Sequence, residues 1–249
     1  MIMSKTPTRV VRVFNKYAML LDGVDDEIVI PYNSAFDLQE YTIEVAFLPI
    51  SFINAGGKGD AVFCRHDRIH YANQYVIGLY SPTTASFFFT IGGVNRWLFT
   101  PIALGRPWHI TATAKSGEQR LYRNAELTTQ ASFTGTFSYV AKNLRIGRSG
   151  WGDPAHIYFY FARLYSGVLT PEEAELNYRH PYSPVRDELL LWLHAHPNYI
   201  RDVDGDGVLE LVDLSGNGNH GKVYGATLVE VVKTPARVLA PVRALPPAR

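Results

Sequence analysis

Short runs in which apolar and polar residues alternate cover most of the chain. Alternation with a period of two is typical of a half-buried β-strand, because successive side chains of a strand point to opposite faces. Clusters of Gly, Pro, Asn and Ser separate the runs, and turn-forming residues at such short spacing are typical of a β-sandwich. The runs that predict strands are residues 19–21, 28–30, 41–47, 61–64, 75–80, 86–91, 108–114, 119–123, 144–147, 156–164 and 188–193.

One segment breaks the alternation and predicts a short helix. Thr170-Pro171-Glu172-Glu173 places a capping hydroxyl, a proline at the first helical position and two carboxylates at the positive end of the helix dipole. The helix is expected to end at about Arg179, since Pro181 and Pro184 follow it. The chain is therefore expected to be all-β with one short helix.

The two ends of the chain differ from the strand-rich middle. Residues 1–16 are polar and basic with an alternating run at Val10–Phe14, which predicts an N-terminal arm or an edge strand. Residues 231–249 are rich in Pro, Val, Ala and Arg, which predicts an extended C-terminal arm. Residues 17–230 are then expected to form a single domain, because all-β domains commonly reach this length.

Composition supports strands and excludes several classes of protein. Aromatic residues make up 13% of the 249 residues and suit the pleated surface of a sheet. The 24 Lys and Arg nearly balance the 23 Asp and Glu, which excludes the basic footprint of a nucleic-acid partner. No apolar stretch approaches the roughly 18 residues of a membrane helix, and no signal peptide is recognisable, so membrane insertion is not expected. Cys64 is the only cysteine, so no internal disulfide can form.

Five runs follow one another in an order typical of a known fold. They are Leu21–Pro31, Tyr41–Val45, Trp108–Ala112, Leu144–Gly147 and Phe161–Thr170. In this order they resemble the laminin-G-like jelly roll of the concanavalin A-like lectins and glucanases. The resemblance covers most of the chain, and it implies an antiparallel β-sandwich with a jelly-roll topology.

The position of one further segment differs from the family. The segment from Leu189–Leu193 through Asp213–Gly221 resembles one that in the family usually precedes the counterpart of Asp22–Asp26, yet here it follows it. The resemblance therefore implies a circularly permuted jelly roll, whose first strand comes from the C-terminal end. That strand either folds back into its own sandwich or completes a neighbouring copy by strand exchange, and both geometries stay open.

An acidic loop near the C-terminus has the spacing of a calcium-binding loop. Asp202, Asp204 and Asp206 form a D-x-D-x-D-G pattern, in which alternate carboxylates around a tight turn converge as oxygen ligands. The backbone carbonyl of Val208 falls at the seventh position, and Asp213 falls at the twelfth, where calcium loops prefer Glu. The loop predicts a structural Ca²⁺ site. A turn without metal is the alternative, because no helix is expected on either side.

A second acidic turn contains Asp22, Asp25 and Asp26. It resembles the acidic turn of the family, which implies that one of these carboxylates can join a calcium site at the rim of the sandwich. Turn formation alone also explains Asp and Gly at these positions, and it is the interpretation that we prefer.

Two segments predict loops that present an indole beside polar groups. One contains Asn95 and Trp97, and the other contains Arg148, Trp151 and Asp153. Such an arrangement is typical of a glycan-binding surface, since sugar sites combine rings with a few polar groups. The alternative is that both indoles pack against the rim of the sandwich. Trp108 and Trp192 lie within strand patterns and are expected in the core.

Catalysis is not expected. A retaining glycosidase of this superfamily needs two carboxylates roughly 5 Å apart, and the strand that matches by position offers Glu44 alone. The chain has no G-x-S-x-G motif, and Cys64 lies in an apolar run.

The function predicted first is therefore a non-enzymatic structural or adhesion protein with a lectin-like jelly roll. It would be a virion or surface assembly subunit that self-associates through exchanged strands or terminal arms, and it would work outside the cell or on a virion surface. A monomeric, calcium-dependent carbohydrate-binding module is the alternative. A glucanase-like hydrolase is a third one.

Overall fold

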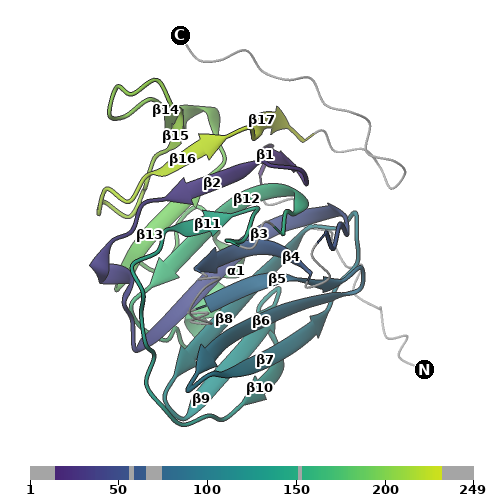
Figure 1. The fold of residues 1–249 in the computed structure, drawn as a ribbon, viewed down its shortest axis with the longest axis vertical. Coiled ribbons are helices and arrows are strands. Elements are labelled where there is room, and N and C mark those ends of the chain that lie inside the picture. Colours follow the sequence, from purple (N-terminus) through teal and green to yellow (C-terminus); the bar gives the residue numbers. More distant parts are fainter. Residues whose placement is uncertain (1–14, 56–58, 66–74, 151–152, 232–249) are drawn as a thin grey trace, which may run out of the picture.

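The computed structural model describes residues 15–55, 59–65, 75–150 and 153–231 and shows two antiparallel β-sheets packed face to face (Figure 1). This arrangement confirms the predicted all-β sandwich. The predicted arms lie almost wholly outside the described residues, as do Val10–Phe14 and Trp151.

One sheet, sheet A, is organised around strand β12. β12 pairs with β3 along one side and divides its other side between β1 and β13. The order is β10-β9-β8-β3-β12-β1-β17. The strands are β1 (Tyr17–Asp22), β3 (Glu40–Ser51), β8 (Trp108–Lys115), β9 (Glu118–Arg123), β10 (Glu126–Ala131), β12 (His156–Tyr165), β13 (Leu189–His194) and β17 (Thr227–Glu230).

Sheet B covers the other side of the core. Its order is β14-β15-β16-β2-β11-β4-β5-β6-β7, so C-terminal strands form one end of it and β7 forms the other. The strands are β2 (Glu27–Ile30), β4 (Asp60–Arg65), β5 (Tyr75–Ser81), β6 (Thr84–Ile91), β7 (Val94–Pro101), β11 (Leu144–Ile146), β14 (Ile200–Arg201), β15 (Glu210–Leu211) and β16 (Gly221–Tyr224).

The core lies between the sheets, and strand alternation decides which side chains enter it. Phe63, Ile77, Phe87 and Leu98 lie opposite one another on β4 to β7 and belong to the main core cluster. Burial of each such side chain contributes about 1.5 to 3 kcal/mol. Trp108 also belongs to this cluster, as predicted. The residues next to these along each strand point to the outer face of the sheet.

Helix α1 (Pro171–Arg179) is the predicted helix. The Thr170 side chain accepts a hydrogen bond from the Glu173 backbone, and the Glu173 carboxylate accepts one from the Thr170 backbone, so the capping box is complete. Two short 3-10 turns, η1 (Ser34–Phe36) and η2 (Pro197–Tyr199), complete the helical elements of the described residues. Within those residues, no helix has the length and apolar character to cross a membrane.

The C-terminal strands complete both sheets beside the first hairpin of the chain. β16 pairs with β2, placing Val223 opposite Ile28, and β17 pairs with β1, placing Val229 opposite Ala18. In Figure 1 the yellow end of the chain lies beside the purple beginning. The chain thus closes its own sandwich in this structure. Strand exchange would form the same pairs between two chains, so self-association stays a prediction.

The strands predicted from alternation are present, but the loop predicted at Asn95-Arg96-Trp97 is wrong. These residues lie in β7, where Trp97 is opposite Phe88 of β6. The connection between the two strands is Gly92-Gly93, and both glycines have positive φ, 58° and 77°. A two-residue turn with positive φ at both positions is a tight hairpin connection, so the strand resumes directly after it.

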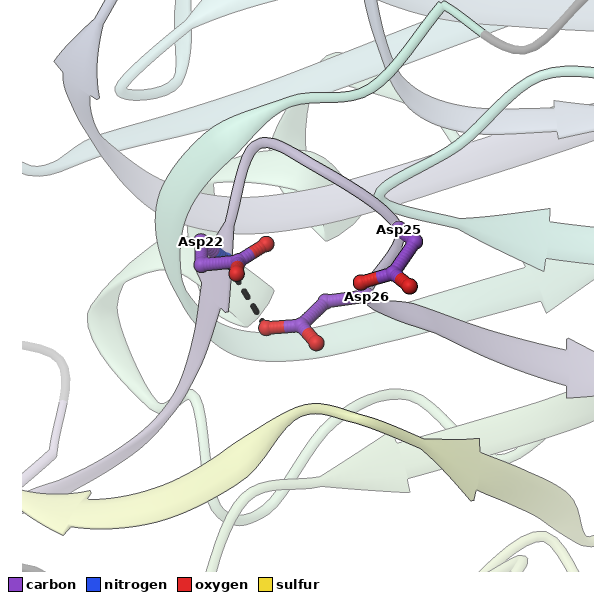
Figure 2. A group of neighbouring side chains, drawn as sticks. All are labelled: Asp22, Asp25 and Asp26. Atoms are coloured by element: carbon purple, nitrogen blue, oxygen red, sulfur yellow. Dashed lines mark hydrogen bonds between the residues drawn. The ribbon is translucent and has the colours of Figure 1, made fainter.

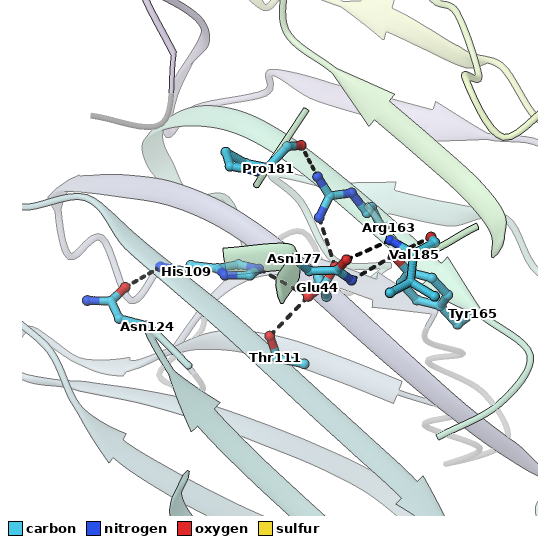
Figure 3. A network of polar contacts seen from close by, with 9 residues as sticks. All are labelled: Glu44, His109, Thr111, Asn124, Arg163, Tyr165, Asn177, Pro181 and Val185. Carbon is cyan, nitrogen blue, oxygen red and sulfur yellow. Dashed lines mark hydrogen bonds and ion pairs between the residues drawn. The ribbon is translucent and has the colours of Figure 1, made fainter. Parts of the chain in front are cut away.

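A buried polar network ties α1 to sheet A (Figure 3). The Glu44 carboxylate accepts hydrogen bonds from Arg163 at 2.9 Å, from Asn177 of α1 at 3.0 Å and from Thr111 at 3.4 Å. His109 Nε2 lies 3.4 Å from the same carboxylate. Burial alone would raise the pKa of Glu44, but the His109 hydrogen bond and the Arg163 charge outweigh it, so this pKa lies below its ordinary value.

Replacing Glu44 by Gln is expected to lower the unfolding free energy by about 3 to 5 kcal/mol, because Arg163 is then buried without its counter-charge. Urea unfolding measures this change. The matched control is Glu175→Gln, which breaks the exposed pair of Glu175 with Arg179 and should cost less than about 1 kcal/mol. Equal losses in both variants would show that the buried pair does not hold the fold.

Candidate functional site

Four aromatic side chains form a group on the outer face of sheet B, which we call the ring cluster: Tyr80, Phe88, Trp97 and Phe99. They come from β5, β6 and β7, the three strands at one end of the sheet. They point outward because their neighbours along the strands, such as Phe87, point into the core.

The rings of this cluster pack against one another. The centroids of Phe88 and Trp97 are 4.0 Å apart with their planes at 24°, and those of Trp97 and Phe99 are 5.7 Å apart with planes at 4°. Tyr80 meets Phe99 edge-on at 5.0 Å. Such pairs contribute about 0.5 to 1.5 kcal/mol each beyond the area that they bury, so the cluster keeps its shape without a ligand.

The ring cluster is open to solvent and has a polar margin. Tyr80 is 53% exposed and Phe99 is 39% exposed, while the other two rings are half-buried. Two residues along each strand from the pair of Phe88 and Trp97, the Thr90 hydroxyl donates to the Asn95 amide oxygen at 2.6 Å. Apolar groups gathered on an exposed surface with a polar rim are typical of a binding site.

A cross-strand row connects the ring cluster to the middle of sheet B. From β11 to β7 the register places Arg145, Cys64, Val76, Phe88 and Trp97 opposite one another in turn. Burial raises the pKa of the Cys64 thiol to about 12, so this cysteine is an unreactive part of the row.

The second predicted glycan segment lies over the same face. The Arg148 carbonyl accepts a weak hydrogen bond from Cys64 Sγ at 3.5 Å. Three strand spacings separate Cys64 from Trp97, which is roughly 14 Å. Asp153 is buried and its carboxylate accepts from the Ser149 hydroxyl at 3.0 Å, so it holds its own loop. The structure therefore joins Asn95 and Trp97 in one site and sets Arg148 and Asp153 apart from it.

The predicted calcium loop connects β14 and β15, and the ammonium group of a lysine from another strand lies between its carboxylates. Oxygens of Asp202, Asp204 and Asp206 lie within 4.8 Å of one another, which fits the hard oxygen ligands of Ca²⁺. Lys222 of β16 donates to Asp204 at 2.8 Å and also to Asp206. These two carboxylates raise the pKa of Lys222, so its charge neutralises part of the loop. Calcium would have to displace this ammonium.

Of the other two predicted calcium ligands, Val208 bonds within the loop, whereas Asp213 has a separate role. The Val208 N–H donates to Asp206 at 2.8 Å. Asp213 is buried, and its carboxylate accepts from the backbone of Trp192, Ser215 and Asn219 and from the Ser215 hydroxyl. Asp213 thus fixes the turn after β15 against β13. A Ca²⁺ site with all five ligands remains a prediction.

The second acidic turn connects β1 and β2 (Figure 2). The Asp22 N–H donates to the Asp26 carboxylate at 2.9 Å, and the Val24 N–H donates to Asp22 at 2.8 Å. Gly23 between them has a φ of 78°, which favours glycine. Burial raises the pKa of Asp26. These are the bonds of a turn, although ligand oxygens of Asp22, Asp25 and Asp26 also lie within 4.8 Å of one another.

Sequence reasoning found one ring of the cluster and missed three, Tyr80, Phe88 and Phe99. The pair Gly92-Gly93 between two alternating runs predicts a hairpin and could have indicated Phe88 and Phe99. Tyr80 lies on β5, outside this hairpin. A hairpin places Phe88 and Trp97 on one face, and the alternation adds Phe99.

Comparisons with known proteins identify the fold. The profile of the Laminin_G_3 family, described as the concanavalin A-like lectin/glucanases superfamily, matches residues 22–175. The structure is similar to that of a "putative carbohydrate binding protein" from Bacteroides ovatus, with a TM-score of 0.62 and 15% identity, over 91% of this chain and 62% of that chain. This chain thus spans less than two thirds of the Bacteroides protein.

Two further solved structures are similar. The binding domain of Paraclostridial Mosquitocidal Protein 1 has a TM-score of 0.53 and 14% identity, over 69% of this chain and 45% of that one. The Ruminococcus gnavus IT-sialidase CBM40 has a TM-score of 0.50 and 13% identity, over 65% of this chain and 96% of that one. At these identities the similarity shows the fold alone. No curated protein matches the sequence.

Replacing Lys222 by Met is expected to tighten Ca²⁺ binding by about tenfold or more, because Asp204 and Asp206 then face each other without the ammonium. Calorimetric titration with CaCl₂ measures the affinity of the parent and the variant. The matched control is the double variant Lys222→Met/Asp204→Asn, in which the increase in Ca²⁺ affinity should disappear. The same affinity in the parent and in Lys222→Met would show that this loop is not a calcium site.

Proposed function

The chain belongs to the concanavalin A-like lectin/glucanases superfamily, and from this premise we propose that it is a non-enzymatic carbohydrate-binding module whose ligand lies on the ring cluster. The observation that carries the proposal is the exposed face of Tyr80, Phe88, Trp97 and Phe99 at one end of sheet B. The Bacteroides ovatus protein, which shares the fold, is described as a "putative carbohydrate binding protein".

The chemistry of the ring cluster suits a sugar. A sugar ring has apolar C–H faces and a margin of hydroxyl groups, so it pairs with an aromatic surface that has polar groups beside it. The exposed rings offer the first part, and Asn95 and Thr90 at the margin offer the second. Because the surface lies at the edge of a sheet and is not enclosed, we expect an extended glycan that passes over it.

A hydrolytic role does not fit the carboxylate that strand β3 provides. Glu44 is fully buried and already binds Arg163 and Asn177. A glycosidase needs two carboxylates that both face the sugar, one of which must change its protonation state during the reaction. Glu44 serves instead to hold α1 on sheet A, which supports the non-enzymatic proposal.

Calcium is not expected to take part in this binding. The loop of Asp202, Asp204 and Asp206 contacts β16, and six strand spacings, roughly 29 Å, separate β16 from β7. A Ca²⁺ ion in that loop would therefore act on the C-terminal strands and not on the sugar. Its proposed role is structural.

Assembly is a second proposal, and it rests on the placement of the last strands. β16 and β17 pair with β2 and β1 through backbone hydrogen bonds, and a neighbouring chain could supply the same strands. β17 also forms the edge of sheet A in the described part of the chain, and an edge strand can pair with another copy. A subunit of a virion or a cell surface would use both features outside the cell.

Replacing Trp97 by Ala is expected to weaken glycan binding about 10- to 100-fold, because this ring stacks on both Phe88 and Phe99 at the centre of the cluster. A printed glycan array with the purified chain identifies the probe, and calorimetry with the tightest binder measures the affinity. EDTA should leave the affinity unchanged.

The control for this experiment is Tyr224→Ala. Tyr224 is 43% exposed and lies on β16, at the opposite end of the same sheet. The Tyr224→Ala variant should bind the glycan probe with the same affinity as the parent chain. Equal weakening in both variants, or no loss in Trp97→Ala, would place the binding site elsewhere, and an array without any bound glycan would contradict the proposed function.

The assembly proposal predicts that the mass of the chain rises with concentration. Light scattering over a concentration series measures it, and truncation before Val231 should lower the mass if the C-terminal segment helps to join subunits. A monomer at every concentration would rule out assembly through exchanged strands.

A further inference from the structure

A cavity of about 350 Å³ opens on the outer face of sheet A. It lies at the fork where β12 changes partner, since β1 pairs with β12 up to Phe159 and β13 pairs with it from Phe161 onward. Asn15, just before β1, joins the two branches. Its Nδ2 donates to the Ala195 carbonyl at 2.6 Å and contacts His194 Nε2 at 3.0 Å.

Aromatic and imidazole rings form most of the wall of this cavity: Tyr182, Trp192, His194, His196 and Tyr199. The centroid of His194 lies 5.2 Å from that of Tyr182 and 5.7 Å from that of Tyr199. Trp192 is buried, as predicted, but it belongs to a small cluster outside the main core. The volume and the lining are typical of a small-molecule site.

The two histidines each present an N–H donor. Asn15 Nδ2 can only donate, so His194 Nε2 accepts and the neutral ring carries its proton on Nδ1. The Asn198 N–H donates to His196 Nδ1 at 3.2 Å, so this neutral ring carries its proton on Nε2. Burial lowers the pKa of His194 to about 4 and also lowers the pKa of His196, so both rings are neutral near pH 7.

Trp192 adds a third N–H donor. Two guanidinium groups lie beside its indole and make its surroundings positively charged. Its indole Nε1 is buried and has no hydrogen-bond partner in the described part of the chain, which is rare for a buried polar atom. The Arg186 guanidinium lies 4.5 Å from the indole centroid, and that of Arg163 lies 5.4 Å from it. Arg163 is neutralised by Glu44, whereas no ion pair of Arg186 occurs within the described residues.

We propose that this cavity binds the carboxylate-bearing ring of an acidic sugar, a uronic or sialic acid residue. A carboxylate only accepts hydrogen bonds, so it matches the N–H groups of Trp192, His194 and His196. Among the described residues that line the cavity there is no Asp or Glu to repel it, and Arg186 lies beside it. The positive charge of Arg186 would repel a cationic ligand. The choice of a sugar rests on the proposed function, whereas the carboxylate follows from the donors.

The probes that test this site are acidic sugars and their neutral counterparts. Glucuronate and glucose form one matched pair, galacturonate and galactose form another, and N-acetylneuraminate is a third acid. Saturation-transfer NMR and calorimetry with the full chain measure binding. Each pair differs only at the carboxylate, so at least one acid should bind about tenfold more tightly than its neutral counterpart. Equal binding within both pairs, without binding of N-acetylneuraminate, would overturn the proposal.

Variants locate the binding within the cavity. Trp192→Phe keeps a ring and removes the N–H, and Arg186→Gln removes the charge from an exposed position. Each should weaken binding of the acid about tenfold. Arg179→Gln, on the exposed side of α1, is the control and should have no effect. If Trp192→Phe fails to fold, Arg186→Gln still decides, and an unchanged affinity in it overturns the proposal.

A variant of the ring cluster distinguishes acid binding in this cavity from glycan binding at the site of the proposed function. Trp97→Ala should leave binding of the acidic sugar unchanged, since Trp97 lies on the other sheet. Loss of acid binding in Trp97→Ala would assign the acid to the ring cluster and overturn the cavity proposal. Acid binding that depends on Arg186 while Trp97→Ala binds array glycans normally would support the cavity and contradict the ring cluster.

Discussion

The structure depends on how strand β12 shares its backbone hydrogen bonds. One side of β12 is occupied by β3 along its length, and the other side is long enough for two partners, β1 and then β13. Because β1 and β13 use the same edge, they must diverge where one replaces the other. The fork explains why Asn15 must bridge the branches and why a cavity lies there. It also leaves the far side of β1 open for β17, the last described strand.

The buried pair of Glu44 and Arg163 connects strand β12 to helix α1 and to Trp192 of the cavity. Arg163 lies on β12 directly opposite Trp192 of β13, so the ion pair that anchors α1 also sets a guanidinium beside the indole. A buried pair contributes little net stability compared with apolar residues of the same shape, but removing one partner is costly. The carboxylate that would suit a glycosidase by position is therefore committed to structure, and Asn177 fixes it further.

Local sequence patterns predicted the elements of this fold, whereas its site geometry depends on contacts between distant residues. Alternation gave the strands, and Thr170 with Glu173 gave the helix start, since both signals lie within a few residues. Spacing likewise gave the acidic loop, but the lysine within it comes from β16 and meets Asp204 only through the register of β15 and β16. The bond of Asn15 to His194 joins residues 179 positions apart, so no local pattern could indicate it.

The ring cluster and the cavity lie on opposite outer faces, and this placement limits how they can act together. The two sheets pack about 10 Å apart, so the full thickness of the sandwich separates the sites. A linker that cannot span two sites gives no gain in effective concentration. A short glycan therefore cannot occupy both proposed sites at once. Under the two proposals each face would take its own ligand, and a module of this kind would join separate glycan chains.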